Sequence, residues 1–278
     1  MASSTSSETR ITGTALLDAL ESGAVRVAER SADGVWRVNG WVKEEILALF
    51  RASGVVAKGL ECAPSSGPSV FRDKEPFDVR RWTAEQNVRV VPGGSAVRRG
   101  AFVAPTCVLM PPCYVNVGAS IGAGTMIDSH ALVGSCAQIG ERVHVSAAAQ
   151  IGGVLEPANA RPVIVEDDCF VGGNCGVYEG VLLRKGAVLA AGTILASGTV
   201  VYDVVREREL RGTREAPLEI PERAVVVPGS RPITPAEPQK GPLESWSTHR
   251  GLHVACALIV KYRDEKTDRA TALEDALR

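Results

Sequence analysis

Histidine has the broadest chemistry of the residue types in this chain, since an imidazole can act as a general base near neutral pH or bind zinc. His130 and His144 lie in the middle of the chain, 14 residues apart, whereas His249 and His253 lie near the C-terminus. A zinc site of three histidines is excluded because no third histidine is within range of the central pair. Each central histidine is either a candidate base or a surface or hydrogen-bonded residue.

The seven cysteines are an odd set without a CxxC pair. This usage is typical of reduced thiols in a cytoplasmic protein and not of a secreted disulfide framework. Cys175 is the one thiol that we weigh as a nucleophile, and an inert core thiol is the favoured alternative. We therefore expect neither a metal site nor a cysteine nucleophile.

The charge balance restricts the possible partners. Lys and Arg total 31 against 32 Asp and Glu, which gives a net charge of -1. A protein that coats nucleic acid or a membrane surface would carry a basic excess, so neither partner is expected. The late apolar run from Leu252 to Val260 is too short to cross a bilayer.

A period of six residues runs through the central chain and must position any site there. The first run of aliphatic residues at this spacing is Val97, Val103, Leu109, Val115, Ile121, Ile127, Val133, Ile139, Val145 and Ile151. After a shift of two residues the spacing resumes at Val165, Val171, Val177, Leu183, Leu189, Leu195 and Val201. Four residues after most of these positions stands a small side chain, among them Cys107, Cys113, Cys169 and Cys175.

The residue three positions after the aliphatic one is often glycine, at 100, 118, 124, 180, 186, 192 and 198, with Asp168 and Asn174 at equivalent places. These residue types tolerate the positive φ of a sharp corner. The pattern predicts short parallel strands coiled with three hexads per turn, stacked about 4.8 Å apart. The fold class is mainly β, with a small α/β domain at the N-terminus and a short strand and helix at the C-terminus.

Four segments follow from this pattern. Residues 1–9 are predicted to be a disordered tail, and 10–88 an N-terminal α/β domain whose final part, 62–88, is a linker. Residues 89–230 form the β-helix, and 231–278 a C-terminal segment with a strand in LHVACALIVKYR and a helix in ATALEDALR.

Five stretches of the central chain closely resemble the tetrahydrodipicolinate N-succinyltransferase family, acyltransferases of bacterial lysine synthesis. The N-terminal LLDALESGAVRVAE and the C-terminal ACALIVKYRDEKT resemble the same family, so the similarity covers most of the chain. The resemblance implies that the β-helix is left-handed and that the protein is a homotrimer. The five stretches are RVVPGGSAVRRGAFVAP, VLMPPCYVNVGASIGAGTMID, VGSCAQIGERVHVS, IGGVLEP and EDDCFVGGNCGVYEGV.

The resemblance also implies the site residues. Arg89 in RVVP matches the arginine that binds substrate, Asp128 in GTMID matches the acid that binds substrate, and Glu179 in YEGV matches a second catalytic acid. A guanidinium suits a dicarboxylate acceptor, and a carboxylate can orient its amine and accept the proton. The alternatives are a surface ion pair for Arg89, a corner hydrogen bond for Asp128 and a solvated charge for Glu179.

Spacing indicates where the site lies. Asp128 and Glu179 are seven or eight hexads apart. At three hexads per turn this separates them by roughly 11–13 Å along the axis, on different faces. The two acids therefore cannot serve one site within a single subunit, and a site that uses both lies between neighbouring chains.

The resemblance implies succinyl-CoA as co-substrate, lying in the groove between adjacent β-helices. A solvated basic edge is the alternative for Lys261 and its neighbour Lys266. The residues that we assign to acyl-CoA are Ser146, Gly153, Asn174, Gly192, Lys261 and Lys266.

The chain departs from the family near this groove. Asn174, Cys175 and Gly176 stand where the family has an Arg-Ser-Glu run, and Ser129 and His130 replace a Thr-Trp pair. Loss of the arginine removes one cationic partner for the terminal carboxylate of a succinyl group. An acetyl group has no terminal carboxylate and needs no cationic partner. A branch of the family in tabtoxin biosynthesis, which transfers acetyl from acetyl-CoA, is therefore an alternative, and an inactive β-helix scaffold is a second one.

Overall fold

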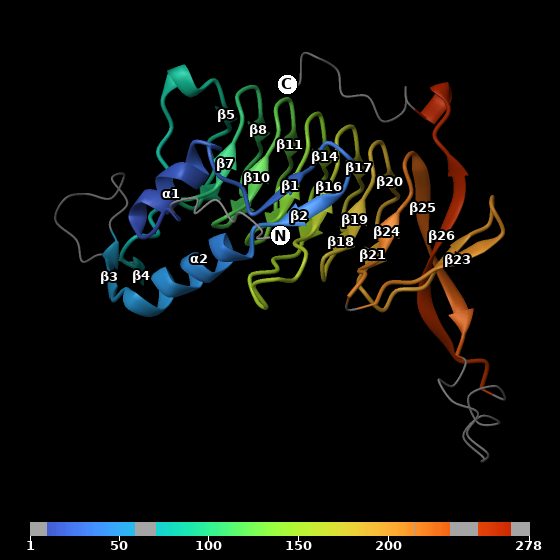
Figure 1. Ribbon diagram of the computed structural model, residues 1–278. Helices are drawn as coiled ribbons and strands as arrows, with labels where there is room; N and C mark the ends of the chain where they lie inside the picture. Colours follow the sequence, from blue (N-terminus) through green and yellow to red (C-terminus); the bar gives the residue numbers. More distant parts are fainter. Residues whose placement is uncertain (1–9, 59–70, 214, 234–249, 268–278) are drawn as a thin grey trace.

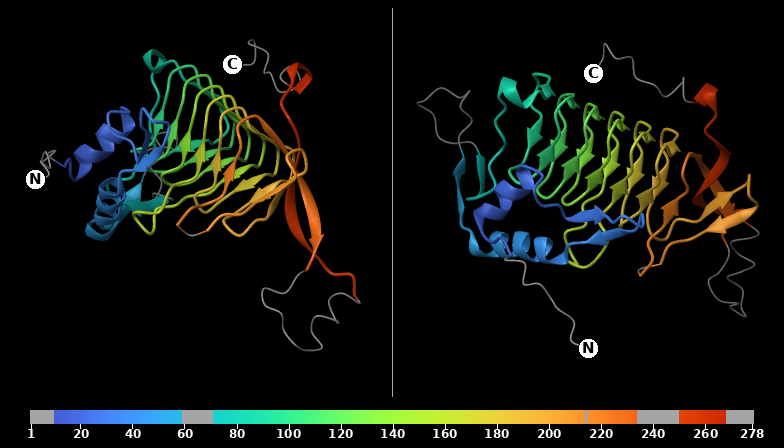
Figure 2. Two further views of the ribbon diagram at one scale, coloured as in Figure 1. Left: turned by 45° about the vertical axis from the view of Figure 1, so that its right-hand side comes forward. Right: turned by 45° about the horizontal axis from the view of Figure 1, so that its top comes forward.

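The computed structural model describes residues 10–58, 71–213, 215–233 and 250–267 of the chain. These residues form a long parallel β-helix, with an α/β segment at its N-terminal end and an extended ribbon at its C-terminal end (Figure 1). The predicted disordered tail, 1–9, lies outside the described residues. Figure 2 shows the coils stacked along one axis, with the N-terminal segment packed along one side.

Each coil contributes one short strand to each of three faces. Face 1 contains β5 (Arg89–Val90), β8 (Val108–Leu109), β11 (Met126–Ile127), β14 (His144–Val145), β17 (Phe170–Val171) and β20 (Val188–Leu189). Face 2 contains β6 (Ala96–Val97), β9 (Tyr114–Val115), β12 (Leu132–Val133), β15 (Gln150–Ile151), β18 (Gly176–Val177) and β21 (Ile194–Leu195). Face 3 contains β7 (Phe102–Val103), β10 (Ser120–Ile121), β13 (Gln138–Ile139), β16 (Ile164–Val165), β19 (Leu182–Leu183) and β24 (Glu219–Ile220).

The six-residue period explains this architecture. In the regular coils, parallel pairing joins a strand to the strand 18 residues on, as in Met126↔His144 and Ile127↔Val145. Across the insertion between β15 and β16 the offset grows to 26 residues, as in His144↔Phe170. The second residue of each strand points inward, so Ile127 and Val145 have no exposed surface. The small residue between strands is also buried, and Cys107 and Ala149 are fully so. The prediction of one large and one small inward residue per hexad is confirmed.

The corners use the left-handed backbone region. Asp168 (φ 60°) and Asn174 (φ 56°) adopt it as predicted, and so do six of the seven predicted glycines. The prediction is wrong for Gly198, whose φ is not positive. Gly198 follows β21, where the chain leaves the regular coil.

The N-terminal segment contains α1 (Thr14–Glu21), β1 (Ala28–Arg30), β2 (Trp36–Val38) and α2 (Gly40–Ala52). β1 and β2 form an antiparallel hairpin. An apolar cluster joins both helices to the β-helix through Leu17, Ile46, Val117 and Cys136. Lys43 of α2 is fully buried and donates a 2.6 Å hydrogen bond to the carbonyl of Ala160, which attaches α2 to the loop between β15 and β16.

The stretch predicted as a linker, 62–88, contains ordered structure. β4 (Phe71–Lys74) pairs antiparallel with β3 (Val55–Lys58), and a short 3₁₀ helix covers Ala84–Gln86. Pro, Ser and Gly favour loops locally, but this composition does not reveal that residues 71–74 form a strand, whose partner lies earlier in the chain.

The C-terminal strands extend face 1. β25 (Ala224–Pro232) pairs with β20, and β26 (His253–Tyr262) lies between β25 and β22 (Val201–Asp203), which pairs with β23 (Arg208–Leu210). The predicted strand in LHVACALIVKYR is confirmed. The boundary at residue 230 cuts through β25, so the strand of the C-terminal segment belongs to the sheet of the β-helix. The predicted terminal helix, ATALEDALR, lies entirely beyond residue 267, outside the described residues.

No helix in the described part of the chain is long and apolar enough to span a membrane.

Candidate functional site

Asp128 lies at the corner that joins face 1 to face 2, directly after β11. The backbone N–H of Ser129 donates a 2.7 Å hydrogen bond to its Oδ1. Its side chain is 29% exposed, so the carboxylate is fixed on one side and open to a ligand on the other. The corner hydrogen bond that we gave as an alternative for Asp128 therefore exists, and it engages Oδ1.

Arg89 lies on the same face, two strands away. β5, β8 and β11 are consecutive in the sheet, with Arg89 paired to Val108 and Val108 to Met126, a separation of about 10 Å between Arg89 and Met126. Arg89 is exposed and lines a cavity of about 400 Å³ together with Asn87 and Thr106. An anionic group can therefore reach the guanidinium from solvent.

Glu179 lies at another corner, between β18 of face 2 and β19 of face 3. It is exposed and its carboxylate accepts hydrogen bonds from the backbone N–H of Ser197, at 3.0 Å, and from the Ser197 hydroxyl. These hydrogen bonds lower the pKa of Glu179 below its ordinary value, the hydroxyl having the larger effect. Glu179 is thus held as a carboxylate, the form that a base requires.

The structure brings Arg89 and Asp128 onto one face and leaves Glu179 apart from both. In face 2, β15 lies between β12 and β18. Asp128 comes just before β12 in the sequence, and Glu179 comes just after β18. The two acids therefore differ in corner and in level along the axis, as the hexad count predicts.

Three of the residues assigned to acyl-CoA lie beyond Asp128 on the same side of the β-helix. Backbone hydrogen bonds connect successive corners between faces 1 and 2: Ala148 N–H to Ser129 O, Asn174 N–H to Ala147 O, and Gly192 N–H to Gly173 O. Ser146 directly follows β14 and stands beside Asp128 in the register of the sheet. Asn174 and Gly192 are exposed at this edge.

The other three assigned residues lie elsewhere. Gly153 follows β15 on the side of Glu179, near the corner between faces 2 and 3. Lys261, in β26, is 3.7 Å from Asp264 and donates to the hydroxyl of Thr267. Lys266 is exposed in the helical residues 265–267, which follow β26.

His144 is a residue whose relation to the site the sequence did not reveal. Its Nε2 lies 3.8 Å from Oδ2 of Asp128. Asp128 is thus the carboxylate partner that sequence inspection did not identify for this histidine. The signal that could have found the pair is the 18-residue coil, which places residue 144 beside residue 126. His130 lies exposed at the corner, with φ 61°.

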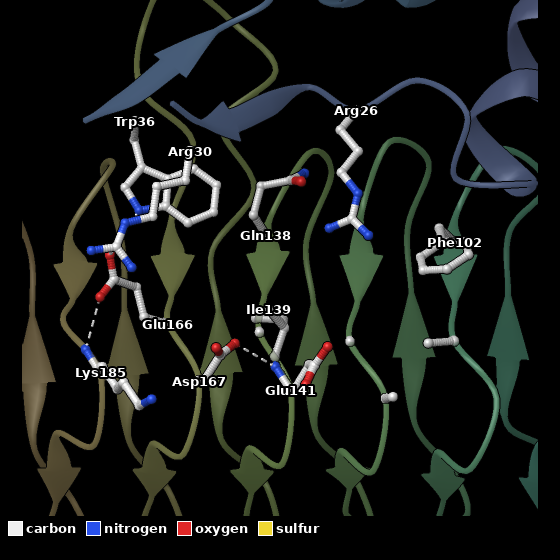
Figure 3. A pocket seen from close by; sticks show the side chains of 14 residues that line it. Arg26, Arg30, Trp36, Phe102, Gln138, Ile139, Glu141, Glu166, Asp167 and Lys185 are labelled. Atoms are coloured by element: carbon white, nitrogen blue, oxygen red, sulfur yellow. Dashed lines mark hydrogen bonds and ion pairs between the residues drawn. The ribbon is translucent and has the colours of Figure 1, made fainter. Parts of the chain in front are cut away.

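The second large cavity lies between the N-terminal segment and face 3, away from Arg89 and Asp128. Figure 3 shows Arg26, Arg30 and Trp36 extending from the N-terminal segment across this cavity of about 410 Å³. Trp36 Nε1 donates a 2.9 Å hydrogen bond to Glu166, which is 5% exposed and also accepts from Arg184 Nη1 and from the backbone N–H of Lys185. These contacts attach the hairpin to the β-helix.

The described cysteines are buried thiols. Burial raises the pKa of Cys107 to about 11 and also raises the pKa of Cys175. The Cys175 thiol donates a 3.0 Å hydrogen bond to Ala190 O. Geometry and pKa both make Cys175 a core residue and not a nucleophile. Among the described residues, no three of His, Cys, Asp and Glu converge to hold a metal ion.

Two family models match the chain. Residues 1–52 match the model described as "Tetrahydrodipicolinate N-succinyltransferase N-terminal", and residues 162–197 match "Hexapeptide repeat of succinyl-transferase". The predicted left-handed hexapeptide β-helix and the N-terminal domain are thereby confirmed.

Similar proteins are known over nearly the whole length. The 2,3,4,5-tetrahydropyridine-2,6-dicarboxylate N-succinyltransferase of Bradyrhizobium diazoefficiens is 44% identical and covers 100% of this chain and 93% of that protein. The protein of the same name from Nitrobacter hamburgensis is 44% identical over 94% of this chain and 87% of that protein. A solved Campylobacter jejuni structure described as a 2,3,4,5-tetrahydropyridine-2-carboxylate N-succinyltransferase covers 88% of this chain and 61% of that one, at 17% identity. Its TM-score of 0.44 is too low to add to the argument. The two close relatives establish that this chain is an acyltransferase of the tetrahydrodipicolinate N-succinyltransferase family.

Proposed function

We propose that the protein transfers a succinyl group from succinyl-CoA to the amine of hydrated, ring-opened tetrahydrodipicolinate, in lysine and diaminopimelate biosynthesis. The observation that carries the proposal is the placement of Arg89 and Asp128 on one face, with the arginine open to a cavity of about 400 Å³. A cation and a carboxylate on one face complement an acceptor that has carboxylates and an amine.

The chemistry needs no covalent enzyme intermediate. Arg89 binds a carboxylate of the acceptor through its two-pronged guanidinium. The amine nitrogen attacks the thioester carbonyl, the C–N bond forms as the C–S bond breaks, and the amine proton passes to a carboxylate while CoA leaves as a thiolate that is then protonated. Asp128 and Glu179 are the two candidates for this base.

The active site is composite in this proposal. Asp128 of one subunit and Glu179 of its neighbour face a shared groove in a cytoplasmic homotrimer. Acyl-CoA follows the corner between faces 1 and 2 past Ser146, Asn174 and Gly192, while Gly153 lies on the side of Glu179 and contributes from the neighbouring subunit. The separation of the two acids supports this arrangement, because one chain cannot bring both to one amine. Lys261 already contacts Asp264 and Thr267, so Lys266 is the better candidate for a CoA phosphate.

The acyl donor has a specific alternative. Asn174 is exposed and uncharged at the corner where the family has an arginine, and a succinyl carboxylate there loses one cationic partner. An acetyl-CoA-dependent reaction, as in the tabtoxin branch, is the second candidate function.

The test is the release of free thiol from succinyl-CoA and from acetyl-CoA, each with tetrahydrodipicolinate or an aminopimelate analogue. Preference for succinyl-CoA, abolished by Asp128→Asn, supports the proposal. Preference for acetyl-CoA overturns the succinyl donor and favours the second candidate. Absence of turnover with either donor contradicts both candidate functions and favours the inactive β-helix scaffold.

A further inference from the structure

His144 and Asp128 form a pair on the outer surface of face 1. Asp128 follows β11 and His144 begins β14, the next strand of the sheet. The distance from Nε2 of His144 to Oδ2 of Asp128 is 3.8 Å. The other oxygen, Oδ1, accepts the hydrogen bond from Ser129 N–H. The carboxylate is therefore in contact with a different group at each oxygen.

The imidazole is itself held in place. Its ring meets the ring of Phe170 edge-on, with centroids 5.1 Å apart and an interplanar angle of 83°. The side chain is 16% exposed and both ring nitrogens are shielded from solvent. A ring packed in this way keeps one orientation, since rotation would break the aromatic contact.

Two titratable groups in the described part of the chain have a recorded interaction with the Asp128 carboxylate. They are His144 from β14 and Cys113, which precedes β9 and whose thiol contacts Ser95. A thiol cannot carry a positive charge, so of these two groups the imidazole is the one that can place a positive charge beside Oδ2.

We propose that His144 is a positioning residue for Asp128, which fixes the carboxylate rotamer so that the exposed edge meets the acceptor amine. The inference rests on the proposed function, since it concerns the carboxylate that binds and orients the amine. His144 gains and loses no proton in the net reaction. Its effect is to keep Asp128 within the narrow range of geometry that proton transfer and nucleophilic attack require.

The first test compares variants in the succinyl-transfer assay. His144→Phe keeps the ring packed on Phe170 but removes the polar nitrogen, and we expect kcat to fall about 10- to 100-fold with little change in KM for succinyl-CoA. His144→Gln places an amide donor near Oδ2 and should recover most of kcat. The matched control is His130→Asn, since His130 lies exposed at the same corner and asparagine tolerates its positive φ. Equal losses in His144→Phe and His144→Gln would contradict the inference.

A double-mutant cycle separates positioning from general damage. If His144 acts through Asp128, His144→Phe should have little additional effect on kcat/KM once Asp128 is Asn. A merely structural role would instead give multiplicative losses, and that result would overturn the inference.

A spectroscopic test does not depend on turnover. The ring ¹⁵N and ¹H resonances of His144, assigned by their absence in His144→Gln, should shift on Asp128→Asn but not on Glu179→Gln. Unchanged resonances would refute the pair even in an active enzyme. If instead the resonances shift while the wild-type protein transfers no acyl group, the pair stands and the proposed function fails.

Discussion

Asp128 and Glu179 occupy different corners of one β-helix, Asp128 between faces 1 and 2 and Glu179 between faces 2 and 3. The strands beside them are also separated by an intervening coil, since β15 lies between β12 and β18. The rigid ladder of parallel hydrogen bonds fixes this separation, so no change of rotamer brings the two carboxylates together. A site that uses both acids has to be completed by a second copy of the chain.

Arg89 is predicted to act in acceptor binding. Arg89→Ala should raise KM for the acceptor at least about 10-fold and leave KM for succinyl-CoA nearly unchanged, because a charge-assisted bidentate contact is lost. Arg89→Lys should recover only part of the loss, since an ammonium cannot reproduce the two-pronged contact. Steady-state kinetics with each substrate varied in turn measures both constants. Arg37→Ala, on the hairpin of the N-terminal segment, is the control, and an unchanged acceptor KM in Arg89→Ala would remove Arg89 from the site.

Ser197 is predicted to control the pH dependence of Glu179. Its hydroxyl and backbone N–H lower the pKa of Glu179, so the carboxylate stays ionised to lower pH than an ordinary glutamate. Ser197→Ala removes the larger of these contributions, and the pKa of Glu179 should rise toward its ordinary value. If activity requires ionised Glu179, the acidic limb of the kcat/KM profile should move to higher pH in Ser197→Ala. Measurement of kcat/KM across the acidic range checks this, with Ser197→Thr as the control that retains the hydroxyl. An unmoved limb would show that Glu179 does not limit the reaction at low pH.

Glu166 is predicted to be a stability residue. Glu166→Ala leaves Trp36 Nε1 and the N–H of Lys185 without their buried acceptor and removes one partner of Arg184. The free energy of unfolding should fall by about 3 kcal/mol, as expected when one side of a buried charged network is deleted. Urea unfolding followed by circular dichroism measures the change. Glu141→Ala is the matched control, because Glu141 lines the same cavity but its side chain is 54% exposed. Equal effects of the two substitutions would argue against the buried network.

The sequence predicts those parts of the fold that are determined by a residue's own type or by its near neighbours in the sequence. The period of six determines which residues point inward, and Ile127 and Cys107 are buried as a result. Asp168 and Asn174 adopt positive φ because their own side chains tolerate it. The pairing of β3 with β4 escaped prediction because residues 59–70 separate the two strands in the sequence, and neither strand has a distinctive pattern of its own.

The parts of the site that escaped prediction depend on neighbouring coils. His144 meets Asp128 only through the 18-residue stacking. Ser197 reaches Glu179 in the same way, exactly one 18-residue coil further on. Trp36 and Glu166 are 130 residues apart in sequence, and their contact follows from how the N-terminal hairpin lies on face 3. No local pattern contains that information.

The most direct test of the composite site is complementation between inactive subunits. Asp128→Asn and Glu179→Gln chains, each inactive alone, are co-expressed with different tags, and the mixed oligomers are purified and assayed for succinyl transfer. In a mixed trimer one of the three intersubunit sites combines an intact Asp128 with an intact Glu179, so the purified mixed trimers should recover about one third of the wild-type activity. Mixed oligomers that remain as inactive as their parents would contradict the account, since a site within one chain can never combine intact Asp128 with intact Glu179.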